Sequence, residues 1–434
     1  MNETTSPSGV PFERPAVRDR ARPASSGWVH RLAKHIVFAR LQRLQHGRLT
    51  IIDGADRTDF GQASAEGVLH AAVTVADPHT YLDVALGGTI GVSSAYRLGL
   101  WTCDDLTALV RIFVLNRDLL DRMERGPAFL SRPLFKALHW WNRNTRAGSR
   151  RNIAAHYDLG NDFFRLMLDE TMMYSCAYFE RPDATLAEAS RAKNDRICRK
   201  LELSPSDHLL EIGTGWGGFA IHAASHYGCR VTTTTVSRQQ YDLAVRRVEE
   251  AGLSDRVTVL LQDYRELPSL GRQFDKLVSI EMIEAVGHEY YGTFFDVCRR
   301  MLTPNGLMLV QAITIHERFY ERAKRSVDFI QHAVFPGSCI PSISALVRAS
   351  SEAGRLNLVS LEDIGAHYAP TLRAWRRNVV RARQTIAKLG YQPDFLRHWE
   401  FYLCYCEGGF LERSISNVQL LFSQPGWRPA PVGC

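Results

Sequence analysis

Apolar runs of strand length alternate with longer helix-like stretches through the second half of the chain. From about Leu201 onward these runs are His208–Ile212, Arg230–Val236, Val257–Gln262, Lys276–Ile280 and Gly306–Ile313. Nearly continuous apolar runs separated by helix-length segments are typical of parallel strands that helices cover on both faces. The pattern therefore predicts an α/β fold with a mostly parallel, Rossmann-like sheet.

The first part of the chain has a different pattern. A basic, helix-like segment covers Val29–Gln45, and apolar and polar residues then alternate in short runs from Leu49 to about Val92. An apolar helix is expected around Leu109–Leu120. These elements predict a small α+β domain over residues 28–125. No run of 18 apolar residues occurs in the sequence, so any membrane contact is expected to be peripheral.

Two segments look like connections rather than packed elements. Residues 1–27 are rich in Pro, Ser and Arg and lack an apolar run, which predicts a disordered tail and no signal peptide. Residues 126–151 interleave aromatic and basic side chains, which we interpret as a linker between domains. Two interpretations of it stay open: a segment lying in the headgroup layer of a bilayer, or a helix docked on its own protein with a solvated basic face.

Composition and charge indicate the kind of surface that the protein favours and its cellular compartment, but they do not identify a partner. The chain has 53 Lys and Arg against 46 Asp and Glu, a net charge of +7, which favours anionic surfaces such as nucleic acid or anionic lipid. Its nine cysteines show neither a CxxC pair nor a Cys/His metal spacing, so no metal site and no disulfide framework are expected. The odd cysteine count and the missing signal peptide predict a cytoplasmic protein.

A glycine-rich turn follows the first predicted strand of the sheet. The run LLEIGTGWGGF at 209–219 lies between an apolar strand and a helix, where glycines let the backbone approach a ligand closely. Gly213, Gly215 and Gly218 also fit the spacing of a dinucleotide fingerprint, so a nicotinamide or flavin site has to be weighed.

The residues after the next two strands favour a nucleoside without a pyrophosphate. No acid ends the second strand; Thr235, Ser237 and Gln240 follow instead, a polar set that suits ribose hydroxyls. The third strand leads into Asp263 and Tyr264, which offer an acid and an aromatic ring for the edge and face of an adenine. These features favour S-adenosylmethionine over a dinucleotide and over a purely structural turn.

Several longer motifs in a fixed order carry a family resemblance. They are HYDLGNDFF at 156–164, YSCAYF at 174–179, the glycine loop, and FPG with IPS at 335–342. From about Asn152 to Ser423, and more faintly over Ile90–Leu106, the chain resembles the cyclopropane-fatty-acyl-phospholipid synthase and mycolic-acid methyltransferase family. The resemblance implies a class I methyltransferase domain over residues 152–434 that uses S-adenosylmethionine.

The resemblance also implies two groups of site residues. The cofactor group is Tyr174, Ser175, Gly213, Gly215, Gly217, Thr235, Gln240, Asp263 and Tyr264. The group around a small anion beside the reacting carbon is Cys176, Glu284, Tyr368 and the backbone of Ile313, and Cys406, Gln311 and His156 lie in matching motifs. Structural roles stay open for three of these, because packing alone explains a buried Cys176 or Cys406 and a lone His156 is commonly a helix cap.

Three positions depart from the better-known cyclopropane synthases, and one of them is Ala285 in place of a histidine. Glu281 stands where those enzymes have a glycine, and Gln311 stands where they have the histidine that helps to hold bicarbonate. An alkene that attacks a methyl sulfonium becomes a carbocation, from which a base has to remove a proton. Glu281 is expected to be that base. The alternative base is a bound bicarbonate. A purely structural interpretation also stays open, in which Glu281 is a solvated acid at the end of a strand. The stretches EMIEAVG and QAIT resemble the branch that makes methylene- or methyl-branched fatty acids.

Together these patterns predict a methyltransferase that adds one carbon to the cis double bond of an unsaturated phospholipid acyl chain. The product is a cyclopropane or a methylene or methyl branch. The alternatives are a C- or N-methyltransferase of a soluble small molecule and an inactive module that binds nucleic acid or membrane. The linker and the arginines between 373 and 383 favour lipid. We expect a lipid-interacting N-terminal domain, peripheral attachment to an anionic inner membrane surface and no nucleic-acid partner, with a homodimer left open.

Overall fold

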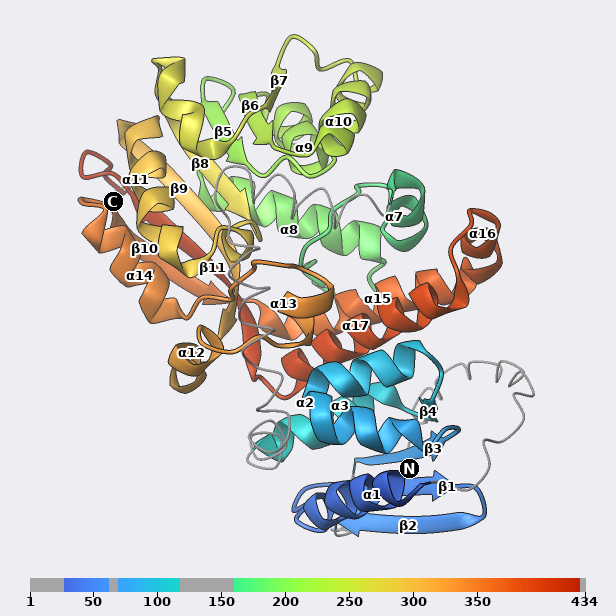
Figure 1. Cartoon of the computed structure of the whole chain (residues 1–434). Helices are drawn as coiled ribbons and strands as arrows, with labels where there is room; N and C mark the ends of the chain where they lie inside the picture. The colour runs from blue at the N-terminus through green and yellow to red at the C-terminus, as the bar shows by residue number, and fades with distance from the viewer. Residues whose placement is uncertain (1–26, 62–68, 118–159, 430–434) are drawn as a thin grey trace, which may run out of the picture. The chain divides into compact units, whose positions relative to one another are not determined.

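The computed structural model describes residues 27–61, 69–117 and 160–429 of the chain (Figure 1). The chain divides into two compact units, residues 1–128 and 129–434. The predicted linker at 126–151, and the predicted tail apart from Gly27, lie outside the described residues. No helix in the described ranges is long and apolar enough to cross a membrane.

A four-stranded sheet and helices make up the described part of the first unit. Its elements are α1 (Trp28–Leu41), β1 (Arg48–Asp53), β2 (Asp56–Gly61), β3 (His70–Val75), α2 (His79–Arg97), β4 (Trp101–Cys103) and α3 (Leu106–Leu115). The strand order is β2-β1-β3-β4, with β1 parallel to β3 and the other two pairs antiparallel. The unit is therefore of the α+β type that the sequence predicts.

The alternation between Leu49 and Val92 predicts strands throughout, but its last part forms helix α2. Buried Tyr81, Val84 and Ala85 recur at the helical spacing of three to four residues. The helix kinks at Gly88, whose φ of 55° and ψ of −134° leave the helical region. This break divides the helical pattern into two pieces so short that each looks like a strand.

A seven-stranded sheet forms the centre of the second unit. Its strands are β5 (His208–Ile212), β6 (Arg230–Thr235), β7 (Val257–Leu261), β8 (Phe274–Ile280), β9 (Leu302–Ile315), β10 (Asn357–Asp363) and β11 (Ile415–Ser423). The order is β10-β11-β9-β8-β5-β6-β7, in which β5 to β9 are mutually parallel and β11 runs antiparallel to both neighbours. The predicted mostly parallel α/β fold is confirmed.

Helices and short helical turns connect these strands. The α-helices are α7 (Asn161–Met167), α8 (Leu186–Lys200), α9 (Gly218–Tyr227), α10 (Arg238–Glu250), α11 (Tyr291–Met301), α12 (Glu317–Ala323), α13 (Phe329–Ala333), α14 (Ile343–Glu352), α15 (Tyr368–Arg381), α16 (Arg383–Lys388) and α17 (Pro393–Leu411). The 3₁₀ turns are η2 (Tyr264–Leu270), η3 (Ile283–Ala285), η4 (His288–Tyr290) and η5 (Gly365–His367). The long helices α15 and α17 pack side by side (Figure 1).

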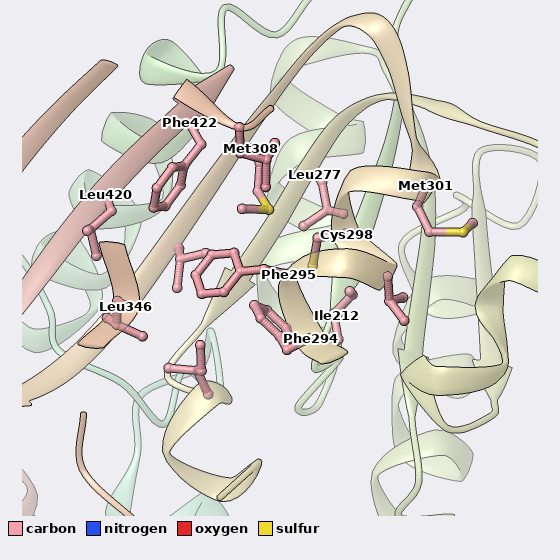
Figure 2. Packing of buried hydrophobic residues seen from close by; sticks show 14 of the residues in the cluster. Ile212, Leu277, Phe294, Phe295, Cys298, Met301, Met308, Leu346, Leu420 and Phe422 are labelled. Atoms are coloured by element: carbon pink, nitrogen blue, oxygen red, sulfur yellow. The ribbon is translucent and has the colours of Figure 1, made fainter. Parts of the chain in front are cut away.

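Successive side chains of the central strands enter two different cores. Figure 2 shows one core, in which Phe294, Phe295 and Cys298 of α11 pack against Met308 and Leu420 of the sheet. The neighbouring strand positions belong to the other core, together with apolar residues of α8, α9 and α10. Because strand side chains alternate between faces, this division explains why the central strands carry buried apolar residues on both faces.

Candidate functional site

The glycine-rich turn lies at the carboxyl end of β5. Gly213, Gly215 and Gly217 have φ values of +105°, +52° and +84°, which side-chain-bearing residues rarely adopt. The amides of Gly213 and Thr214 donate to the Thr234 carbonyl of β6, at 3.0 and 3.1 Å. A Cβ on Gly215 would meet no protein atom within 4 Å. The turn therefore presents bare backbone to open space at the edge of the sheet where ligands bind in parallel α/β folds.

The polar residues at the end of β6 and just after it form hydrogen bonds with one another next to this turn. Thr235 Oγ1 donates to Gln240 Oε1 at 2.9 Å, and the Ser237 amide donates to Thr235 Oγ1 at 3.1 Å. Both Thr235 and Gln240 are buried. This arrangement fixes their side chains and leaves the Gln240 amide nitrogen as a donor suited to a ribose hydroxyl.

Asp263 and Tyr264 follow β7, where the sequence places an adenine. Asp263 is buried, and both of its carboxylate oxygens accept from the Arg265 guanidinium, at 2.8 and 2.6 Å. The Tyr264 ring packs edge-on against Phe294 with 5.7 Å between ring centroids. Arg265, which the sequence reasoning did not name, therefore neutralises the Asp263 charge beside the predicted base position.

Tyr174 and Ser175 are held by aromatic and cationic neighbours. The Tyr174 hydroxyl lies 2.9 Å from the Tyr402 hydroxyl of α17, and its ring is 5.2 Å from that of Trp375. The Ser175 hydroxyl accepts from the ammonium of Lys193, at 3.1 Å. Lys193 is completely buried in α8, and this burial lowers the pKa of its ammonium to about 8. A cation without solvent contact behind the site was not predicted from the sequence.

Glu281 is the centre of the polar cluster beyond the cofactor turn. Its Oε1 accepts from the Cys176 amide at 2.9 Å, from Gln311 Nε2 at 2.8 Å and from Asn417 Nδ2 at 2.7 Å. Its Oε2 accepts from the Tyr368 hydroxyl at 2.6 Å. Residues from four separate stretches of chain therefore converge on one carboxylate. Three of the donors are predicted site residues, whereas Asn417 was not predicted.

The Cys176 thiol, which donates to two backbone carbonyls rather than to Glu281, and the Tyr368 hydroxyl both keep their protons. Burial, and next the negative charge of Glu281, raise the pKa of the Cys176 thiol and of the Tyr368 hydroxyl well above their ordinary values. The Tyr368 ring is also stacked on Phe410, with 4.3 Å between centroids. Both groups are therefore neutral donors near neutral pH, and neither is suited to remove a proton.

Glu284 lies in the same cluster on η3. One carboxyl oxygen accepts from the Ile313 amide, and the other, Oε2, has no hydrogen-bond partner in the described part of the chain. Burial, and next the charge of Glu281, raise the pKa of Glu284 to about 8. Glu284 is therefore mostly a neutral acid at pH 7, and its unmatched oxygen is suited to bind a ligand atom.

One predicted catalytic residue that the structure describes, Cys406, does not join this cluster. Cys406 lies on α17, half-buried, and no hydrogen bond among the described residues connects it to Glu281. His156 lies outside the described residues. Within the ranges that the structure describes, no group of His, Cys, Asp and Glu is arranged to hold a metal ion.

Comparison with known proteins places the chain among lipid-modifying enzymes by sequence. The family model described as mycolic acid cyclopropane synthetase matches residues 144–420. A tuberculostearic acid methyltransferase of Mycobacterium tuberculosis is 36% identical over 341 residues, which cover 74% of this chain and 76% of that protein. The cyclopropane-fatty-acyl-phospholipid synthase of Escherichia coli K12 is 35% identical over 359 residues, covering 82% and 89% of the two chains.

Solved structures of the same group of enzymes share the fold of this chain. A mycolic acid cyclopropane synthase complexed with SAH and CTAB is 32% identical and has a TM-score of 0.58, covering 63% of this chain and 98% of the other. A cyclopropane synthase from Mycobacterium tuberculosis is 30% identical, with the same TM-score of 0.58 and the same coverages of 63% and 98%. The glycine turn, with its open space at Gly215, fits the S-adenosylmethionine that this fold binds. The chain therefore belongs to the mycolic acid cyclopropane synthetase family and is an S-adenosylmethionine-dependent methyltransferase.

Proposed function

We propose that this methyltransferase adds one carbon to the cis double bond of an unsaturated phospholipid acyl chain, with Glu281 as the base that completes the reaction. The names of its relatives support a lipid substrate, since they include a fatty-acyl-phospholipid synthase and a tuberculostearic acid methyltransferase. Loss of a proton from the carbocation gives a cyclopropane, a methylene branch, or a methyl branch beside a retained double bond.

The observation that carries the proposal is the set of donors around Glu281. The resemblance assigns Cys176, Tyr368 and the residue at position 311 to a bicarbonate site, and here all three donate to the Glu281 carboxylate. A carboxylate of the chain thus takes the hydrogen bonds that a bicarbonate would need. Bicarbonate does not fit on donors that are already engaged with Glu281.

The chemistry requires only one proton acceptor at this position. Bound S-adenosylmethionine supplies an electrophilic methyl group to the double bond. The acyl chain then carries a carbocation, and the C–H bond next to it breaks as the Glu281 carboxylate takes the proton. Near neutral pH, Glu284, the Cys176 thiol and the Tyr368 hydroxyl keep their own protons. Glu281 is therefore the acceptor that this cluster is arranged to support.

The proposal also includes the place where the reaction occurs, a membrane surface. We propose that residues 28–125 form a lipid-interacting domain and that the protein attaches peripherally to an anionic membrane surface on its cytoplasmic side. The net charge of +7 and the basic, aromatic residues 126–151 support this. A homodimer stays a prediction.

Label transfer tests the function directly. A host expressing the chain is fed methionine with an isotopically labelled methyl group, and its phospholipid fatty acids are analysed by mass spectrometry. We expect one labelled carbon on formerly unsaturated chains, at the position of the double bond. Mild hydrogenation then separates a methylene branch, which takes up hydrogen, from a cyclopropane, which does not. Label confined to soluble metabolites would favour the small-molecule alternative instead.

A further inference from the structure

A buried line of side-chain amides continues from Glu281 to the surface of the second unit. Gln311 donates to Glu281 through Nε2, and its Oε1 accepts from Gln419 Nε2 at 3.0 Å. Gln419 Oε1 accepts from the ammonium of Lys200 at 2.7 Å. Lys200 lies at the end of α8 and also donates to Glu362. We call Gln311, Gln419 and Lys200 the amide line.

The sheet holds the two glutamines opposite each other. Gln311 of β9 and Gln419 of β11 are direct partners in the antiparallel register, and both are almost completely buried. Buried amides need partners for every polar atom, because an unmatched one costs as much as a lost hydrogen bond. Such a pair between two apolar cores is therefore unexpected unless it has a role beyond packing.

The two ends of the amide line fix its direction. An ionised carboxylate only accepts hydrogen bonds, and an ammonium only donates them. With Lys200 at one end and Glu281 at the other, each glutamine has a single orientation that satisfies both neighbours. If Gln311 were reversed, its carbonyl oxygen would face a Glu281 oxygen across the 2.8 Å now spanned by a hydrogen bond. The cation at the surface therefore selects the orientation that supports the carboxylate.

We propose that Lys200 and Gln419 are positioning residues that orient Gln311 and so keep the Glu281 carboxylate charged and aimed at the reacting carbon. The inference rests on the proposed function of Glu281 as the base. Hydrogen bonds in such a line polarise one another, so an effect at Lys200 reaches Glu281 without direct contact. The titratable groups that interact electrostatically with Glu281 are Cys176, Lys193, Glu284 and Tyr368. None of these four is changed by the variants below.

Two variants interrupt the amide line at different places. Lys200→Met keeps the length of the side chain and removes the donor at the surface end. Gln419→Glu places a carboxylate where Gln311 now finds a donor, which forces Gln311 to reverse. We expect kcat to fall about 3-fold to 10-fold in Lys200→Met and about 10-fold or more in Gln419→Glu, since hydrogen bonds to charged groups are the stronger ones. In both, the acid limb of the pH–rate profile should move to higher pH while cofactor affinity stays unchanged.

Arg196→Met is the matched control. Arg196 donates to the same Glu362 that Lys200 contacts, at 3.0 Å from its Nε, but it does not touch Gln419. The control therefore loses a surface ion pair of the same acid and should keep the native pH–rate profile. Lys200→Arg, which restores a donor, should recover most of the native profile. A purely structural role of Lys200 would change the melting temperature without moving the profile.

A second measurement does not depend on turnover. Infrared difference spectra recorded during a pH titration follow the protonation of single carboxyl groups, and Glu281→Gln identifies the band of Glu281. We expect that band to titrate at higher pH in Lys200→Met than in the native protein and the Arg196→Met control. Coincident titrations of Lys200→Met and native protein would overturn the inference. A native protein that transfers no label to lipid would instead overturn the proposed function, and the infrared result would still decide the role of the amide line.

Discussion

Glu281 has a backbone φ of 50°, in the left-handed region that residues with a branched or long side chain rarely adopt. Such a conformation costs about 1–2 kcal/mol for an L-residue other than glycine. The better-known cyclopropane synthases, as the resemblance has them, carry a glycine here, which adopts it freely. Four hydrogen bonds to the Glu281 carboxylate offset this strain. An acid at a position suited to glycine therefore points to the carboxylate itself as the reason for the exchange.

Replacing Glu281 tests whether its carboxylate is the base. Glu281→Gln keeps the size of the side chain but cannot accept a proton, so turnover should fall by about 10²-fold or more. Native activity should not depend on added bicarbonate, because the base belongs to the chain. Initial rates in carbon-dioxide-depleted buffer, with and without bicarbonate, measure both effects. Cofactor affinity serves as the control and should barely change.

Glu281→Gly gives a sharper form of the same test. The glycine relieves the strain at φ 50° and releases the donors of Cys176, Gln311 and Tyr368. Added bicarbonate or acetate should then restore part of the lost activity, because a small carboxylate can bind where the side chain was. A Glu281→Gln variant with nearly native rates, or a native enzyme that needs bicarbonate, would contradict the role of Glu281.

The raised pKa of Glu284 predicts how the free energy of unfolding depends on pH. Its pKa in the folded protein is about 8, raised first by burial and then by Glu281, against an ordinary value of 4.5. Between these values the unfolded chain ionises while the folded one holds its proton, so stability falls as pH rises, by up to about 1.4 kcal/mol per pH unit. Thermal unfolding of Glu284→Gln between pH 5 and about 8 should show a shallower fall than the native protein. Parallel curves would show that Glu284 ionises normally.

Sequence patterns could predict the residues that take part in the reaction but not the buried residues that hold them in position. Glu281 and Gln311 are recognisable because both depart from a motif at adjacent strand ends. Lys193 is not, because it lies in the charged stretch SRAKNDRICRK of α8, where a lysine ordinarily faces solvent. Asn417 and Gln419 lie on a strand that no motif marks, and their role appears only when β11 is paired with β9. Long-range pairing of this kind leaves no local pattern.

At the scale of elements, strand prediction succeeded for the five mutually parallel strands of the sheet. The five predicted runs correspond to β5, β6, β7, β8 and β9, with ends that differ by a few residues. The antiparallel strands β10 and β11 were not predicted. β10 is an edge strand whose apolar residues, Leu358, Val359 and Leu361, form only a short run and are exposed, which makes it hard to recognise. β11 directly follows the long apolar helix α17, from which periodicity alone does not separate it.

Substitutions at two glycines of the turn between β5 and α9 should have different effects, one on cofactor binding and the other on fold stability. A Cβ on Gly215 meets open space, so Gly215→Val should abolish S-adenosylmethionine binding while costing only the strain of its φ of +52°, about 1–2 kcal/mol. A Cβ on Gly218 would lie 2.2 Å from the Thr171 carbonyl oxygen, so Gly218→Ala should destabilise the fold itself, by about 1–3 kcal/mol. Calorimetry of binding and denaturant unfolding separate the two effects.

Gly292 provides the control for this pair. It lies on α11 with no unusual φ, and a Cβ at this position would meet no atom within 4 Å. Gly292→Ala should therefore leave binding unchanged and stabilise the fold by about 0.5–1 kcal/mol. Unchanged cofactor affinity in Gly215→Val would remove the turn from the binding site.

At the scale of the whole molecule, not every arginine that the sequence offers to a lipid surface is free of an acidic partner in the chain. Arg373 and Arg376 were among the residues favouring a lipid surface, but both donate to the buried carboxylate of Glu407, at 3.0 and 3.1 Å. Their charges are therefore partly used inside the second unit. The sequence pattern could not show this, because Glu407 is more than thirty positions away on another helix.

The basic residues of the predicted linker are the stronger candidates for a membrane surface. Arg143, Arg146, Arg150 and Arg151 follow Trp140 and Trp141 in the sequence, which combines cationic groups with rings suited to the headgroup layer. Each basic residue near an anionic surface contributes about 1 kcal/mol. Replacing the four arginines by Gln should therefore lower binding to anionic vesicles by about 10²-fold to 10³-fold at low salt, and should hardly change binding to neutral vesicles.

A second set of four substitutions separates local charge from net charge. Arg165, Arg181, Arg191 and Arg299 each form an ion pair with a nearby acid, and replacing them by Gln lowers the net charge by the same four units. Co-sedimentation with vesicles of matched size, at low and high salt, should show a large loss for the linker variant and a small one for this control. High salt should also weaken native binding, because exposed charges are screened beyond about 8–10 Å. Equal losses in both variants would mean that only the overall charge matters, and equal binding of the native protein to neutral and anionic vesicles would rule out an anionic surface as its partner.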